Sequence, residues 1–154
     1  MVDGDYSVAI KEAEDFVVSN PDSFLTGDYP WRNEGTKTLG FEIADQLYWR
    51  IPDCVVVPVG NGTLIWSVFE AFRELVLVGI TDRIPRIIGV QVENCEAVRV
   101  SDKEALSARD ILASNGIFVE PSGAVSYAGV MKKKLSGTIV AVATGHGLKD
   151  MIRI

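Results

Sequence analysis

A short apolar run, a glycine turn and a long helical pattern together constrain the fold of this chain most. The run Cys54–Val59 is apolar throughout, which is typical of a strand buried on both faces of a parallel sheet. It ends in Gly60-Asn61-Gly62, and apolar residues then recur at helical spacing from Thr63 to Leu77. A second apolar run follows at 87–92. This order predicts a β-α-β unit with a right-handed crossover.

The remaining patterns extend this unit into a three-layer α/β/α domain with a short, mainly parallel sheet. A capping box, Ser101 with Glu104, opens one of the expected helices. Small residues along 121–134 would let another helix approach a sheet or a cofactor closely. Residues 19–35 are expected to be irregular, and 93–101 are ambiguous. Helices are predicted at 6–18, 38–49, 63–78, 101–114 and 121–134, and strands at 53–59, 87–92 and 138–143, with a further candidate at 117–119.

Length and composition fit one domain with its own core. The 154 residues are 47% apolar, and we expect an N-terminal helix and loop at 1–35 and an α/β core at 36–154. The apolar runs are too short to cross a membrane, and the acidic first residues do not resemble a signal peptide. A cytoplasmic protein is therefore expected, with Cys54 and Cys95 as reduced, buried thiols.

Charge and residue counts exclude two kinds of partner. The formal charge is −6, and residues 1–50, with ten acids and four bases, account for it. The only basic run, Lys132–Lys134, is interpreted as a solvated helix end, so no nucleic-acid interface is predicted. A single histidine and two distant cysteines predict no metal site.

Three loops contain residues that are suited to binding an anion or a polar ligand. Gly60-Asn61-Gly62-Thr63 follows a strand, and its backbone N–H groups can surround a phosphate, although glycine is also common there for geometry alone. Thr144 and His146 follow another strand, where the imidazole is either catalytic or structural. Arg32 lies in a charged loop that either clamps an anionic substrate or only forms exposed ion pairs.

Five blocks of sequence, taken in order, closely resemble the threonine synthase family, above all its archaeal members. The resemblance covers nearly the whole chain but only the later part of the family's length. It is carried by Asn33–Ala44, Pro52–Thr63, Gly89–Gln91, Gly116–Pro121 and Thr144–Lys149.

The resemblance implies a fold-type-II enzyme that depends on pyridoxal 5′-phosphate and converts O-phosphohomoserine and water into threonine and phosphate. It implies that the backbone of Gly60, Asn61, Gly62 and Thr63 holds the cofactor phosphate, where Thr63 offers its hydroxyl or caps the helix. It also implies that Thr144 hydrogen-bonds the pyridine nitrogen. Arg32 is implied as an anchor for the substrate's phosphate or for the phosphate ion produced.

The resemblance also implies that parts of the family's site are missing. The family's Schiff-base lysine and an asparagine-containing loop belong to an earlier segment that this sequence lacks, so no lysine here is given that role. The family has several tens of further residues where this chain passes from Asn94 to Asp102. We therefore expect the chain to be inactive alone, with no catalytic residue of its own assigned.

Three functional hypotheses follow. In the first, the chain is the cofactor-binding portion of a threonine synthase, and a complementing N-terminal chain completes the enzyme. In the second, it is a non-catalytic module that binds pyridoxal phosphate or another small phosphorylated metabolite. In the third, it is a remnant that acts through subunit contacts. Apolar surface that is normally covered in the family predicts a homo-oligomer, most simply a dimer.

Overall fold

The computed structural model describes residues 3–4, 6–26, 30–92 and 98–149. The chain divides into two units, residues 1–32 and 33–154, and each is described by itself. The first unit contains α1 (Tyr6–Ser19), which confirms the helix predicted at 6–18. The side-chain amide of Asn20 donates a 2.7 Å hydrogen bond to the carbonyl of Phe16 at the end of α1. Helix α2 (Pro30–Thr36) spans the boundary between the units.

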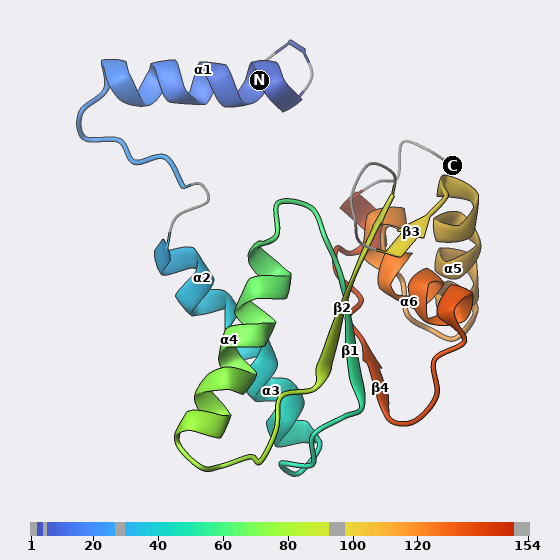
Figure 1. Ribbon diagram of the computed structural model, residues 1–154. Helices are drawn as coiled ribbons and strands as arrows, with labels where there is room; N and C mark the ends of the chain where they lie inside the picture. Colours follow the sequence, from blue (N-terminus) through green and yellow to red (C-terminus); the bar gives the residue numbers. More distant parts are fainter. Residues whose placement is uncertain (1–2, 5, 27–29, 93–97, 150–154) are drawn as a thin grey trace. The chain divides into compact units, whose positions relative to one another are not determined.

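The second unit is built on a four-stranded, fully parallel sheet (Figure 1). Its strands are β1 (Cys54–Pro58), β2 (Arg86–Val92), β3 (Val98–Val100) and β4 (Ile139–Ala141), in the order β3-β2-β1-β4. Cys54 pairs with Arg86 on one side and with Ile139 on the other. Since all strands are parallel, their carboxyl ends lie at one edge of the sheet, the usual place for a ligand in α/β proteins.

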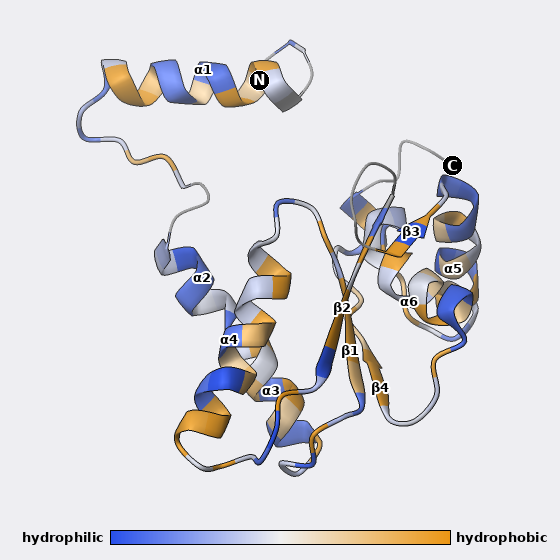
Figure 2. Ribbon diagram, viewed as in Figure 1, coloured by the Kyte–Doolittle hydropathy of each residue, from blue (hydrophilic) through white to orange (hydrophobic). Residues whose placement is uncertain are grey.

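Helices cover both faces of this sheet, as the predicted three-layer fold requires. Helices α3 (Thr38–Gln46) and α4 (Thr63–Leu77) lie on one face, and α5 (Asp102–Ser114) and α6 (Pro121–Lys133) on the other (Figure 1). Successive residues of β1 alternate between the two cores: Val55 and Val57 pack with α4, and Cys54 and Val56 pack with α5 and α6. The residues of β1 and β4 that pack in these two cores are apolar (Figure 2).

Two sequence-based expectations are wrong. The third strand is β3 and not 117–119, because Val119 forms only an isolated antiparallel bridge with His146. Strand β3 has only three residues, and Arg99 is the middle one. This pattern is too short and too polar to predict a strand. Residues 30–35, part of the stretch expected to be irregular, are helical instead, because Pro30, whose ring suits the first turn of a helix, begins α2.

The predicted capping box at the start of α5 is confirmed. The Ser101 hydroxyl accepts a hydrogen bond from the Glu104 N–H, and the Glu104 carboxylate accepts one from the Ser101 N–H at 2.6 Å. Lys132 on α6 donates to the same carboxylate at 3.1 Å. The backbone bond from Ser101 and then the bond from Lys132 hold the pKa of Glu104 below its ordinary value. Glu104 thus joins the start of α5 to the end of α6.

The exposed basic run and the buried thiol also agree with the sequence. Lys132 and Lys133 end α6, and Lys134 follows in a left-handed conformation, with all three side chains exposed. Cys54 is a buried free thiol, whereas Cys95 lies outside the described residues. Among the helices of the described ranges, none has the length and apolar character needed to span a membrane.

Helix α3 ends at Gln46, three residues earlier than the predicted 38–49. Tyr48 and Trp49 adopt φ angles of 54° and 62°, in the left-handed region that glycine prefers. The Trp49 N–H bonds the carbonyl of Ala44 at 2.7 Å, which closes the end of the helix. Tyr48 is 85% exposed, so the packing of its side chain contributes little to stability and does not offset the unfavourable backbone conformation.

Replacing Tyr48 with glycine is expected to stabilise the protein. The left-handed conformation costs a non-glycine residue roughly 1–2 kcal/mol, and the greater freedom of glycine in the unfolded chain offsets about 0.4–1 kcal/mol of that gain. We expect Tyr48→Gly to raise the melting temperature by roughly 2–4 °C in a calorimetric scan. Tyr48→Ala removes the same ring but keeps the strain. Equal melting temperatures for the two variants would contradict this account.

Candidate functional site

The glycine turn lies where β1 ends and α4 begins. Gly62 is the N-cap residue, with φ 90°, a conformation that only glycine adopts readily, and Thr63 is the first helical residue. Thr63 therefore does not occupy the capping position that the sequence left open for it. The Asn61 side-chain oxygen accepts a 3.2 Å hydrogen bond from the Thr63 N–H and so shapes the turn.

This turn presents backbone donors to open space. Among the described residues, no protein acceptor bonds the N–H groups of Gly60 and Gly62. A methyl group built on either glycine would meet no atom within 4 Å beyond its chain neighbours. The first-turn N–H groups of a helix add positive potential at the same place. The geometry therefore suits a phosphate or another small oxyanion.

The loop after β4 lies next to this turn. Val56 pairs with Ala141, and the Val142 N–H still bonds the Val56 carbonyl at 2.9 Å. Thr144 comes three residues after Ala141, and the turn begins at Gly60, four residues after Val56. The fold therefore brings Thr144 and the glycine turn, both predicted site residues, to the same edge of neighbouring strands. Thr144 is half-buried, and no described residue hydrogen-bonds its hydroxyl.

Helix α6 fixes the position of the Thr144 loop by direct backbone contact. A Cβ built on Gly123 would lie 1.5 Å from the Thr144 carbonyl oxygen, so only glycine fits there. The Glu120 N–H bonds the Gly145 carbonyl at 2.9 Å, and the Thr144 N–H bonds the Gly123 carbonyl at 3.4 Å. The small residues predicted to permit a close approach of this helix do so at the site itself.

His146 contacts Phe118, Val119 and the residues that follow it in its own loop. Its ring packs edge-on against Phe118 with the centroids 5.5 Å apart, and its Nδ1 accepts a 3.2 Å hydrogen bond from the Leu148 N–H. Its backbone pairs with Val119. These contacts are the ones that the structural alternative predicts.

Two described lysines, Lys37 and Lys149, form ion pairs with glutamates. Lys37 is buried, and its ammonium lies 2.5 Å from Glu34 and 2.6 Å from Glu74. Glu74 comes eleven positions after Thr63 in α4, about 16 Å along the helix axis from the glycine turn. Lys149 lies closer in the fold, in the loop after Thr144, and pairs with Glu120 at 3.0 Å.

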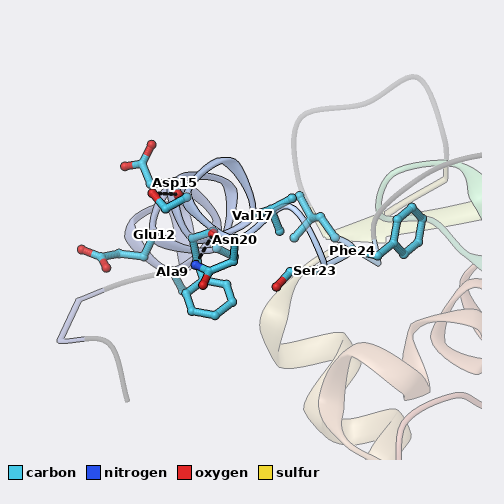
Figure 3. Close-up of a pocket in the computed structure, with 11 residues that line it drawn as sticks. Ala9, Glu12, Asp15, Val17, Asn20, Ser23 and Phe24 are labelled. Atoms are coloured by element: carbon cyan, nitrogen blue, oxygen red, sulfur yellow. Dashed lines mark hydrogen bonds between the residues drawn. The ribbon is translucent and has the colours of Figure 1, made fainter.

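Arg32 is the last residue of the first unit, whereas the glycine turn and Thr144 belong to the second. The role predicted for Arg32 therefore stays a prediction. The first unit has a hollow of its own, about 660 Å³, formed by α1 and the segment after it (Figure 3). Glu12 and Asp15 are among the residues around it, and none of the described lining residues is basic. This hollow does not suit a phosphate.

Sequence reasoning missed three residues that support the site. Gly123 and Glu120 position the Thr144 loop, as described above, and the buried Ser126 donates a 2.6 Å hydrogen bond to the Val142 carbonyl. The run of small residues in α6 gave a signal for Gly123 and Ser126, and no pattern singled out Glu120. Their partners lie about twenty residues further along the chain, and the sequence does not specify that pairing.

Comparison with known proteins places this chain in a family. The family model described as pyridoxal-phosphate dependent enzyme matches residues 1–99. A threonine synthase from Methanocaldococcus jannaschii is 34% identical over 175 positions, covering 79% of this chain and 43% of that protein. One from Synechocystis is 32% identical over 196 positions, covering 97% and 50%. The chain thus spans about half the length of the curated relatives it matches.

These aligned stretches are longer than the 154 residues of this chain, so the relatives contain residues within them that this chain lacks. Solved structures agree on the fold. The processed form of threonine deaminase isoform 2 from Solanum lycopersicum superposes with a TM-score of 0.74 at 21% identity, covering 95% of this chain and 52% of that one. The O-acetylserine dependent cystathionine β-synthase from Helicobacter pylori gives 0.75 at 18% identity, covering 96% and 58%. The chain belongs to the pyridoxal-phosphate-dependent enzyme family, and the curated relatives that it resembles in sequence are threonine synthases.

Proposed function

We propose that this chain provides the cofactor-binding part of a threonine-synthase-like enzyme that converts O-phosphohomoserine and water into threonine and phosphate. One observation carries the proposal: the uncovered N–H groups of Gly60 and Gly62 lie at the same sheet edge as the half-buried hydroxyl of Thr144, in a chain of this family. The threonine synthases among its relatives support the choice of reaction.

The residues present fit pyridoxal phosphate. The glycine turn offers a neutral cradle of backbone donors for the phosphate, with open space above both glycines. The Thr144 hydroxyl can donate to or accept from a ring nitrogen, and as a neutral group it does not favour the protonated nitrogen as a carboxylate would. When bound, the cofactor supplies the electron sink for replacement chemistry at carbon. Arg32 is proposed, from the family resemblance, to anchor the phosphate of the substrate.

The binding proposal predicts two separable effects in an amide NMR titration. Inorganic phosphate and pyridoxal phosphate should both shift the amide signals of Gly60, Gly62 and Leu64. Thr144→Val removes one hydroxyl at nearly constant shape, so it should weaken pyridoxal phosphate by about tenfold, the worth of one hydrogen bond. Phosphate binding to this variant should be unchanged. An absence of shifts at the glycine turn with either ligand would contradict the proposal.

A different outcome of the same titration would favour a non-catalytic module. If pyridoxal phosphate and inorganic phosphate bind equally well to the wild-type chain and to Thr144→Val, the turn recognises phosphate alone. The chain would then bind small phosphorylated metabolites without holding a cofactor ring, which is the second function that the sequence left open.

We also propose that the Schiff-base lysine comes from outside these 154 residues. The ammonium groups of Lys37 and Lys149 are paired with glutamates, which supports this assignment. The pure chain is therefore expected to release no phosphate from O-phosphohomoserine. Borohydride reduction with pyridoxal phosphate, followed by peptide mapping, should label no lysine stoichiometrically. Stoichiometric labelling of one lysine together with phosphate release would overturn this part of the proposal.

A further inference from the structure

The outer edge of β4 is paired with no strand in the described part of the chain. The Cys54 N–H bonds the Thr138 carbonyl, and the Val142 N–H bonds the Val56 carbonyl. In a parallel ladder alternate residues bond the same neighbour, so 138, 140 and 142 face β1. The backbone N–H and C=O groups of Ile139, Ala141 and Ala143 therefore point away from the sheet. Since β4 is the last strand in the order, no described strand pairs with them.

This edge lacks the features by which proteins usually prevent strand addition. The segment 138–143 reads Thr-Ile-Val-Ala-Val-Ala, without a charge, a proline or a glycine. The opposite edge strand, β3, carries Arg99 among its three residues. Ile139, Val140 and Ala141 are only half-buried, although their partners Cys54, Val55 and Val56 in β1 are buried. An apolar strand with free backbone groups on one side is a template for a further strand.

The cores on the two faces of the sheet define what kind of segment fits. Ile139 packs against the core under α5 and α6, and Val140 packs against the core under α3 and α4. A strand added beside β4 would extend both cores at once. It therefore needs apolar side chains on both of its faces, unlike an ordinary solvent-facing edge strand.

The size of the relatives indicates where such a segment comes from. This chain matches 43% of the Methanocaldococcus jannaschii threonine synthase and 52% of the tomato threonine deaminase structure. The unmatched part of such a chain belongs to the same enzyme and is long enough to supply a further strand. We propose that the outer edge of β4 pairs with an extended, apolar segment of the complementary half of a family enzyme. This inference rests on the proposed function, because it takes the occupant from the same enzyme.

Hydrogen exchange of the full chain tests the pairing residue by residue. The chain is coexpressed with the half of the Methanocaldococcus jannaschii enzyme that it does not match, and coexpression of that enzyme's own two halves is the positive control. The amides of Ile139 and Ala141 should exchange at least about tenfold more slowly in the complex than in the chain alone. The Val142 amide, already bonded to Val56, is the internal control and should be protected in both.

Two variants of one residue test the same edge by affinity. Ala141→Pro removes an outward N–H without removing a bond to β1, and prolines are tolerated at edge positions. It should weaken the complex by about tenfold or more, whereas Ala141→Ser, which keeps the N–H, should bind as the wild type does. Thermal melting of each variant alone checks that it is folded.

Three outcomes would overturn the inference. One is the absence of a complex while the control halves assemble, and another is a complex in which Ile139 and Ala141 exchange as fast as in the free chain. The third is protection that grows with the concentration of the chain alone, which would make a second copy the occupant. Phosphate shifts at Gly60 and Gly62 are measured on the isolated chain. They report on the proposed function separately from the result at β4.

Discussion

Adding one methyl group at Gly123 is expected to destabilise the protein and displace the Thr144 loop. In Gly123→Ala the new carbon would lie 1.5 Å from the Thr144 carbonyl oxygen, and a backbone atom cannot rotate out of the way. Overpacking costs about 1–3 kcal/mol, and separating helix from loop also weakens the bonds at Gly145 and Thr144. We expect a loss of roughly 3 kcal/mol and a melting temperature lower by roughly 6–12 °C.

The neighbouring residue provides the control. Ser122 is exposed in the same turn of α6, and Ser122→Ala adds no atom near the loop. Its free energy of unfolding should lie within about 1 kcal/mol of the wild-type value, as is usual for surface substitutions. In Gly123→Ala the amide signals of Gly145 and His146 should move, and pyridoxal phosphate should bind more weakly than in Ser122→Ala. Equal stability and equal binding in the two variants would show that helix and loop do not need this close approach.

Removing the buried charge at Lys37 is expected to have the second large effect. Its ammonium separates Glu34 on α2 from Glu74 on α4, and its side chain is almost fully buried. Lys37→Met fills the space but leaves two carboxylates close together without a cation between them. We expect a clear drop in melting temperature at neutral pH. The triple variant Lys37→Met, Glu34→Gln, Glu74→Gln removes the repulsion as well and should recover most of the loss.

The pH dependence gives an independent check. Hydrogen bonds to Glu34 and then to Glu74 hold the pKa of Lys37 above its ordinary value of 10.5. The ion pair therefore contributes its full stability below that ordinary value, and the contribution is lost as the pH rises through the raised value in the folded protein. Above pH 10.5 the stability of the wild type should fall towards that of Lys37→Met. A constant difference between the two across the alkaline range would argue against the ion pair.

Most of the fold could be predicted from the sequence because local signals specified it. The apolar run before Gly60 and the capping box at Ser101 each depend on residues only a few positions apart. The short strand β3 and helix α2 were not predicted, because three or seven residues give too little periodicity. Helix α3 was predicted too long, because its apolar spacing continues past the point where Tyr48 leaves the helical conformation.

The residues that face the candidate site could be predicted from the sequence, but the contacts that hold them in place could not. Gly60 and Thr144 could be selected because each follows an apolar strand, and parallel strands end at a common edge. The contact of Gly123 with Thr144 and the pairing of Lys37 with Glu74 depend on how helices cross strands and other helices. These contacts join residues 21 and 37 positions apart, so no local pattern in the sequence contains them.

The pairing of β1 with the edge strand β4 also determines when the site can form during folding. The hydrogen bond from Thr138 to Asp53 joins residues 85 positions apart, so closing this ladder carries the entropy of a long loop. Helices form within about a microsecond, but parallel ladders of this separation form slowly. The glycine turn and Thr144 therefore come together only when the last strand docks. A ligand that needs both can bind only chains that have completed the sheet, and such binding shifts the folding equilibrium by mass action.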